Sequence, residues 1–168
     1  QVKYHELYTP VSDDKVVFSN EQIDSLQAYD YPFVSTFPGS DFLLGTVYRG
    51  VGSDVEVYVA PSNLSSGQKP QWKKVLEFKD QARMFSLNTS NLFALKFDEC
   101  PNGELIKFTL SQKGEIKNKT SLVNAEDKII YDDLLTTNEG IYLHGTVHGN
   151  SRLKRIDRDD LTVENIEL

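Results

Sequence analysis

Histidine is the side chain most often used as a metal ligand or proton carrier near neutral pH, and this chain has only three. His144 and His148 lie four positions apart. On a helix that spacing would bring two metal ligands onto one face, whereas on a strand, at about 3.3 Å per residue, it separates them by about 13 Å. The flanking residues alternate as in a strand. We therefore expect two exposed histidines of a β-sheet and predict no metal site.

Residues for hydrolytic chemistry are present but not arranged in a recognisable motif. His5 is followed by Glu6, and serines are plentiful, yet a hydrolytic triad depends on proximity in space and not in sequence. The chain contains no Gly-x-Ser-x-Gly segment, which forms the nucleophile elbow of α/β-hydrolases. We therefore predict no catalytic residue in this stretch, and no cofactor.

Acidic residues form three clusters that could be read as calcium-binding sites, because hard cations prefer several oxygen ligands. None of the three has the 12-residue spacing of an EF-hand loop. Solvated turns and charged strand edges, which discourage unwanted strand pairing, explain them more simply. The three clusters are Asp13–Asp14, Asp132–Asp133, and Asp157 with Asp159 and Asp160.

The segment Gly50–Val55 (GVGSDV) begins like a glycine-rich phosphate-binding loop. It lacks the third glycine of such a loop and the helix that should follow it. We interpret it as a hairpin turn.

Composition limits the scaffold that positions these residues. The chain has 168 residues with 39% hydrophobic residues, 10 Gly and 6 Pro, which is typical of one globular domain. The longest apolar runs, Val57–Ala60 and Leu92–Leu95, are far shorter than the roughly 20 residues that cross a bilayer. The net charge of −7 repels polyphosphate, so a protein, peptide or small molecule is expected as partner rather than a nucleic acid or a membrane.

The cysteine content bears on the cellular location of the protein, and the first residues bear on whether the sequence is a piece of a longer chain. Cys100 is the only cysteine and closes no internal disulfide, which favours a cytoplasmic location and leaves a periplasmic or secreted one open. No signal peptide is visible. The first residue is Gln1 and the only methionine is Met84, so we expect a piece of a longer chain, with a trimmed protein as the alternative.

Alternation of apolar and polar residues dominates the chain and predicts half-buried antiparallel strands. The clearest stretches are Val55–Val59, Glu104–Leu110 and Arg152–Asp157. A helix competes between Glu115 and Glu139, where Ile130, Tyr131 and Leu134 would share one face. We favour strands there, because Thr136–Gly140 has the composition of a hairpin loop.

A weak internal repeat suggests the architecture. Three apolar cores, Phe42–Val47, Leu92–Phe97 and Ile141–Val147, start 50 and 49 positions apart. Each follows a polar turn and precedes an alternating strand, as expected of β-propeller blades. The fold class predicted is all-β: a partial β-propeller of about three four-stranded antiparallel blades plus an extra N-terminal strand. The predicted divisions are 1–27 for strands of a preceding blade and 28–79, 80–124 and 125–168 for the three blades.

Three blades do not close a ring, because closed propellers need at least about four. Two blade faces would then be uncovered, and apolar faces of that kind rarely stay exposed on a monomer. We therefore expect self-association of the chain. The region from Tyr4 to Phe18, taken as an unpaired strand, would also be free to add to a partner's sheet edge.

Four segments resemble one peptidase family. The run Tyr4–Phe18 (YHELYTPVSDDKVVF) resembles the stretch of prolyl oligopeptidases that reads Tyr-His-x-Leu-Gly-Thr, followed by Ser-Glu/Asp-Asp and an apolar strand. Phe42–Gly50, Trp72–Val75 and Leu92–Ile106 are similar to later parts of the same domain. Tyr8 replaces a glycine usual in the motif, so the turn is expected to differ here if that glycine has a positive φ.

The resemblance implies a two-part parent: an α/β-hydrolase domain that cleaves short peptides after proline, and a seven-bladed propeller that covers its active site. This stretch would be a non-catalytic part of that cover. The family's arginine at the position of Arg49 faces the cavity between the domains, so the resemblance implies that Arg49 binds substrate or an interdomain carboxylate. A surface arginine beside a turn is the competing interpretation of Arg49. The competing function is a stand-alone β-rich interaction module, such as a small sandwich.

Overall fold

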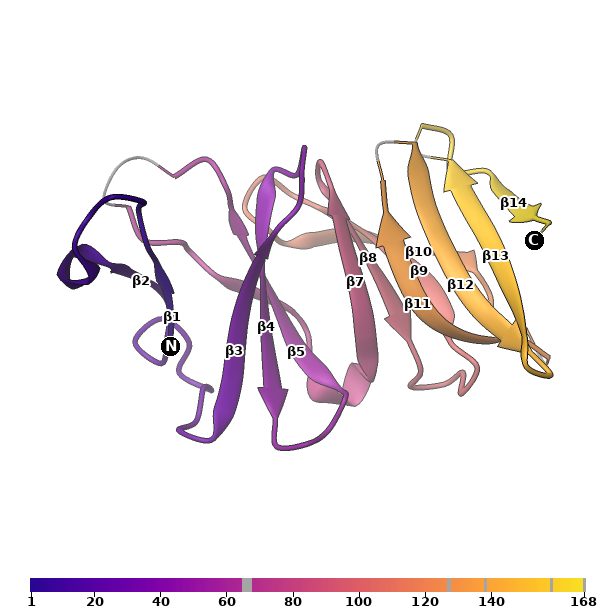
Figure 1. The fold of residues 1–168 in the computed structure, drawn as a ribbon, viewed down its shortest axis with the longest axis horizontal. Helices are drawn as coiled ribbons and strands as arrows, with labels where there is room; N and C mark the ends of the chain where they lie inside the picture. Colours follow the sequence, from indigo (N-terminus) through magenta and orange to yellow (C-terminus); the bar gives the residue numbers. More distant parts are fainter. Residues whose placement is uncertain (65–67, 127, 138, 158, 168) are drawn as a thin grey trace.

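Antiparallel strands make up nearly all of the regular structure (Figure 1). The computed structural model describes residues 1–64, 68–126, 128–137, 139–157 and 159–167. Twelve strands form three four-stranded sheets. The first sheet contains β3 (Asp30–Thr36), β4 (Phe42–Arg49), β5 (Val55–Pro61) and β6 (Lys73–Leu76). The second contains β7 (Ala82–Asn88), β8 (Asn91–Lys96), β9 (Glu104–Leu110) and β10 (Ile116–Val123), and the third β11 (Ile130–Thr136), β12 (Gly140–Val147), β13 (Asn150–Asp157) and β14 (Val163–Ile166).

Each sheet is a meander in which successive strands pair antiparallel. The predicted partial propeller with three four-stranded blades is thereby confirmed. The helical alternative between Glu115 and Glu139 is wrong, because β10 and β11 occupy most of that span. Two short 3-10 turns, η1 (Val11–Asp13) and η2 (Phe78–Asp80), are the only helical elements among the described residues, and neither has the length or hydropathy to span a bilayer. The division of the chain into blades at residues 28, 80 and 125 stays a prediction.

The N-terminal region is a hairpin rather than one unpaired strand. Strand β1 (Val2–Tyr4) pairs antiparallel with β2 (Lys15–Phe18). Between them the backbone turns where the N–H and hydroxyl of Thr9 both donate to the carbonyl of Glu6. Tyr8, with φ of 70°, takes up the left-handed conformation itself. The turn therefore has a backbone that favours glycine, although a tyrosine occupies it.

The core consists of apolar layers between successive sheets. Leu44 and Val57 of the first sheet pack against Leu92 and Ile106 of the second. The opposite face of the second sheet packs against the third in a separate buried cluster. The first strands of the second and third sheets, β7 and β11, lie side by side, and the hydroxyl groups of Ser86 on β7 and Thr136 on β11 share a hydrogen bond. Figure 1 shows the three sheets stacked along the long axis of the molecule.

The structural repeat is slightly shorter than the apolar cores suggested. Strands β4, β8 and β12 begin at 42, 91 and 140, so both intervals are 49 residues. The first predicted interval was 50 because Asn91 was assigned to a turn, whereas Asn88 and Asn91 pair across a two-residue turn. A shift of one residue moves every side chain to the other face of a strand. By the corrected repeat, Leu95 and His144 are equivalent.

Candidate functional site

Arg49 is the last residue of β4, at the turn that leads to β5. Gly50 follows with φ of 64°, a conformation that suits glycine because it has no Cβ. The segment between Arg49 and Val55 joins two paired antiparallel strands, which confirms the predicted hairpin turn. The strand and its turn therefore place Arg49 at one rim of the stacked sheets.

The guanidinium of Arg49 is held between a carboxylate and an aromatic ring. Its Nε and Nη2 donate to Oδ1 and Oδ2 of Asp30 at 3.0 and 3.3 Å. Its Cζ lies 4.5 Å from the ring centroid of Phe78. The side chain of Asp30 is fully buried, while that of Arg49 is 41% exposed. This bidentate pair fixes the orientation of Arg49 and uses two of the five N–H donors that a guanidinium carries.

The surroundings keep both partners charged at neutral pH. Burial opposes the charge of the Asp30 carboxylate, but hydrogen bonds from Arg49 and from the backbone N–H of Gln27 (2.8 Å) lower its pKa overall. The hydrogen bond to Asp30 raises the pKa of Arg49. Arg49 is thus a permanent, oriented cation with part of its surface in solvent.

An aromatic groove lies on the other face of β3 and β4 from the pair of Asp30 and Arg49, because successive residues of a strand point to opposite faces. Tyr31, Phe33 and Tyr48 line it together with Val51, and its volume is about 650 Å³. Tyr31 and Phe33 are more than half exposed. The rings of Phe33 and Tyr48 meet edge to face with centroids 5.6 Å apart. Sequence reasoning missed these residues, although Tyr31 and Phe33 share one face of a strand and Tyr48 lies opposite Tyr31.

A buried polar cluster anchors the segment that leads to Asp30. The Glu56 carboxylate accepts hydrogen bonds from Lys74 Nζ at 2.8 Å and from the Tyr58 hydroxyl at 2.7 Å. The hydroxyl of Ser25 lies 2.9 Å from that of Tyr58. Burial raises the pKa of Tyr58, so it remains a neutral phenol. The cluster ties the loop before β3 to the first sheet and so supports the position of Asp30.

The three histidines occupy separate exposed places. His144 lies on β12, where Nδ1 is 2.5 Å from Oδ1 of Asp132, whereas His148 lies in the β12–β13 turn with φ of 49°. His5 pairs with Asp14 at 2.7 Å and not with Glu6. Among the residues that the structure describes, no three His, Cys, Asp or Glu side chains gather as metal ligands.

The acidic cluster near the C-terminus has a structural role. Oδ1 of Asp157 accepts a hydrogen bond from the backbone N–H of Asp159 at 2.8 Å. Asp160 accepts bonds from the backbone and the hydroxyl of Thr162 at 2.8 and 2.7 Å. These contacts shape the turn between β13 and β14, which agrees with the interpretation as a solvated turn.

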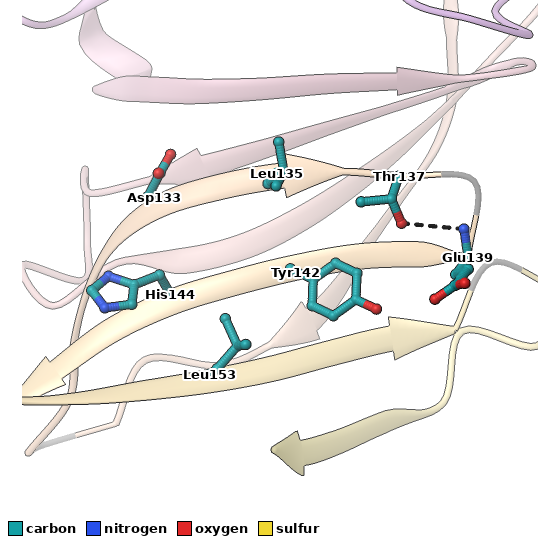
Figure 2. A pocket seen from close by; sticks show the side chains of 7 residues that line it. All are labelled: Asp133, Leu135, Thr137, Glu139, Tyr142, His144 and Leu153. Carbon is teal, nitrogen blue, oxygen red and sulfur yellow. Dashed lines mark hydrogen bonds between the residues drawn. The ribbon is translucent and has the colours of Figure 1, made fainter. Parts of the chain in front are cut away.

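A second groove, here called the outer groove, lies on the open face of the third sheet (Figure 2). Its volume is about 760 Å³. Leu135, Tyr142 and Leu153 supply apolar surface, and His144 lies at one end of it. At the other end the backbone N–H of Glu139 donates to the hydroxyl of Thr137 at 3.2 Å.

Comparisons with known proteins identify relatives of this fold. The family model described as prolyl oligopeptidase, N-terminal β-propeller domain, matches residues 1–168. A solved prolyl endopeptidase, studied for inter-domain dynamics in catalysis and specificity, is similar with a TM-score of 0.76 and 18% identity over 98% of this chain. Prolyl oligopeptidase B from Galerina marginata gives 0.73 and 16% over 98%, and oligopeptidase B from Trypanosoma brucei 0.69 and 17% over 99%.

The chain spans 23% of the length of each of these three solved enzymes. No curated protein sequence matches it significantly. At these identities the solved structures establish the fold alone.

Proposed function

Because the chain belongs to the prolyl oligopeptidase family, as part of its N-terminal β-propeller domain, we propose that it is a non-catalytic propeller segment of a serine peptidase. In this proposal a separate α/β-hydrolase domain cleaves short peptides after proline. The propeller covers the active site, limits access to small peptides and shields the reaction from bulk water, as a lid does.

The observation that carries the proposal is the agreement between the family match and three stacked meander sheets over the same residues. A two-sheet sandwich, the architecture suggested for a stand-alone module, is not what the chain adopts. The further blades and the hydrolase domain are proposed to belong to a longer protein, since the chain covers less than a quarter of the solved relatives.

We propose that Arg49 contacts a peptide carbonyl or an interdomain carboxylate. Its bidentate pair with Asp30 supports this role, because an oriented guanidinium loses less conformational entropy on binding. The aromatic groove on the other face of the same two strands offers ring faces against which an apolar or proline-containing peptide would pack. A surface arginine with only a structural role would show no such binding.

Self-association of the isolated chain is part of the same proposal. The outer face of the third sheet exposes Leu135 and part of Tyr142 and Leu153. Faces that continue a stack of packed sheets are expected to bury this surface against another sheet. A second copy of the chain would supply one when the remaining blades are absent.

Titration of the chain with a short proline-containing peptide, followed by NMR, tests the role of Arg49. We expect weak binding with shifts around Arg49 and Tyr31, and at least about threefold weaker binding in Arg49→Ala. Arg155→Ala is the matched control, because Arg155 of β13 also pairs with a carboxylate, that of Glu164 on β14, far along the chain from Arg49. Equal losses in the two variants would overturn the role of Arg49.

Two further observations test the peptidase assignment. The chain alone should hydrolyse no prolyl peptide amide, since it has no nucleophile elbow. The flanking coding sequence should encode more blades and a Gly-x-Ser-x-Gly segment. A stop codon directly after Leu168, with a start codon near Gln1, would support the stand-alone module instead.

A further inference from the structure

One asparagine of the chain, Asn102, is followed by glycine, and it lies in the loop between β8 and β9. An Asn-Gly sequence is prone to deamidation, in which the backbone nitrogen of the glycine attacks the side-chain amide carbon of the asparagine. Glycine has no side chain to hinder this approach, and its backbone adopts angles that other residues avoid. The fold therefore decides whether Asn102 can react.

The turn that contains Asn102 favours glycine at the next position. Gly103 has φ of 88°, and a Cβ there would lie 3.1 Å from Cε1 of Phe97 and 3.2 Å from Cδ1 of Leu95. The backbone N–H of Gly103 donates to the carbonyl of Cys100 at 2.8 Å, which closes a β-turn. The turn thus requires the reactive sequence and, at the same time, holds the attacking nitrogen in a hydrogen bond.

Asn102 joins the second sheet to the third. Its side-chain amide donates to the backbone carbonyl of Glu126 at 2.9 Å, and its own carbonyl accepts from the backbone N–H of Tyr131 at 2.8 Å. Tyr131 is the second residue of β11 and is 1% exposed, within the apolar layer between the two sheets. Both the side chain and the backbone of Asn102 are therefore held from the third sheet.

Glu126 is itself anchored to two strands of the third sheet. Its Oε1 accepts a hydrogen bond from the hydroxyl of Tyr131 at 2.9 Å and lies 2.9 Å from Nζ of Lys154 on β13. The hydrogen bond from Lys154 lowers the pKa of Glu126, so the carboxylate is charged at neutral pH. The acceptor of the Asn102 amide is thus fixed by an ion pair and a hydrogen bond.

We propose that Asn102 is a deamidation site that the junction of the second and third sheets protects, so that the reaction proceeds only when this junction opens. Attack requires that the N–H of Gly103 leave the carbonyl of Cys100 and that the amide of Asn102 leave Glu126. Local opening of this kind costs free energy in a folded protein. The two sheets meet within the described chain, and the inference is independent of the proposed peptidase function.

The reaction consumes water and releases ammonia. The bond from the nitrogen of Gly103 to Cγ of Asn102 forms, the backbone N–H gives its proton to solvent, and the bond from Cγ to Nδ2 breaks as Nδ2 takes up a proton. Water then opens the cyclic imide. Cleavage of its bond at Cγ gives aspartate, and cleavage at the backbone carbonyl carbon gives isoaspartate.

Neither product can restore the original contact. A carboxylate replaces the amide, and it presents acceptors only to the carbonyl of Glu126, which is also an acceptor. Leaving such groups without a donor at a partly buried place costs free energy. Isoaspartate also lengthens the backbone by one methylene group before Gly103, whose N–H closes the turn. Deamidation therefore converts a transient opening of the junction into a lasting one.

The experiment incubates the purified 168-residue chain at neutral pH, both folded and in urea, and follows Asn102 by peptide mapping with mass spectrometry. Methylation by an isoaspartyl methyltransferase identifies isoaspartate. We expect a rate at least about tenfold lower in the folded chain, which corresponds to about 1.4 kcal/mol for opening the junction. Asn150, an exposed asparagine followed by serine, is the internal reference and should react equally in every folded variant.

Two variants loosen Glu126 and leave Asn102 in place. Lys154→Met and Tyr131→Phe each remove one partner of the Glu126 carboxylate. Each should raise the deamidation rate of Asn102 in the folded chain at least about threefold, as expected from the loss of one hydrogen bond.

Lys74→Met is the matched control. Lys74 and Tyr58 hold the carboxylate of Glu56 in the first sheet with the same kinds of contacts. Its loss should leave the rate at Asn102 unchanged, because that cluster does not contact the junction of the second and third sheets. Circular dichroism melting curves establish that each variant is folded.

Asn102→Asp reproduces one of the two products. Hydrogen exchange of the backbone N–H of Tyr131, which donates to the carbonyl of residue 102, should be at least about tenfold faster in this variant. Asn124→Asp is the control, because it adds the same charge to the connection between the sheets at a residue that bonds to the hydroxyl of Ser121. It should leave the exchange of Tyr131 unchanged.

Deamidation of Asn102 that is as fast in the folded chain as in urea would overturn the proposal. Equal rates in wild type and in both folded variants, Lys154→Met and Tyr131→Phe, would also overturn it. Unchanged exchange of Tyr131 in Asn102→Asp would mean that the junction tolerates the carboxylate, which would overturn the lasting opening.

Discussion

Leu95 and His144 occupy equivalent positions on the second strand of their sheets, 49 residues apart, yet their surroundings are opposite. Leu95 is fully buried in the apolar layer between the second and third sheets. His144 faces the open side of the third sheet, with 36% of its side chain exposed, and bonds to Asp132 and Ser151.

The repeat decides which way a side chain points, but the neighbouring sheet decides whether that direction leads into a core. Where another sheet packs, an apolar residue is required, because burial of a polar group without partners costs free energy. Where none packs, polar side chains and the hydrogen bonds between them are tolerated. Two polar networks with exposed members follow this rule: the one around Arg49 lies at the rim, and the one around His144 lies on the open face.

The largest expected effect is at the closed interface. Leu95→Ala should lower the free energy of unfolding by about 3 kcal/mol, through lost burial and the cavity left behind. Leu135→Ala, at a leucine 62% exposed on the open face, should change it by no more than about 0.5 kcal/mol. Urea denaturation measures both. Similar losses in the two variants would mean that the outer face is packed in solution.

The second effect concerns the ion pair at the rim. Asp30→Asn should destabilise the chain by about 2 kcal/mol at pH 7, because a charged hydrogen-bonding partner of Arg49 is lost. The pKa of Asp30 is lowered on folding, so its contribution is present above the unfolded value of about 3.9 and is lost as pH falls through the folded value.

Urea denaturation at pH 7 and at pH 3 or below should therefore show a difference between wild type and Asp30→Asn that shrinks on acidification. Asp24→Asn, at an exposed aspartate of the same loop, is the matched control and should be nearly neutral at both pH values. A difference for Asp30→Asn that stays constant with pH would contradict the ion-pair explanation.

A third prediction tests whether the open face finds a partner. Leu135→Lys should raise the dissociation constant for self-association at least about tenfold, or about 1.4 kcal/mol, by placing a charge on the apolar surface. Sedimentation equilibrium measures it. Ile116→Lys on the outer strand of the second sheet is the control, with no expected change. A wild-type chain that stays monomeric at high micromolar concentration would refute self-association.

The smallest effect is at an exposed turn without packing. Tyr8 is fully exposed and has a positive φ, so replacing it removes backbone strain and no packing. Tyr8→Gly should raise the free energy of unfolding by about 0.5 kcal/mol, the relief of strain being partly offset by the flexibility of glycine. Tyr29→Gly is the control. Tyr29 is not among the residues with a positive φ, so its replacement by glycine should lower the free energy of unfolding slightly. Thermal unfolding measures both variants.

Sequence patterns alone determined the architecture of this chain. The alternation in Val55–Val59 and Glu104–Leu110, together with a repeat near 50 residues, was sufficient to predict three four-stranded blades. The alternation follows from strand geometry, and a repeat of that length is typical of a repeated unit of several strands. The motif at Tyr4–Phe18 was sufficient to indicate the family, which the family match then established. Arg49 was recognised as the residue that ends an apolar strand at a turn.

Only the tertiary structure decided which polar groups meet. The partners of Arg49 are Asp30, 19 positions earlier, and the ring of Phe78, which comes from beyond the first sheet. Asp132 reaches His144 because of a bulge that no composition signal marks. Strand pairing is set by backbone register, and a slip of one residue exchanges the faces of a sheet. Sequence periodicity fixes spacing to within about one residue, and that is too coarse to assign such contacts.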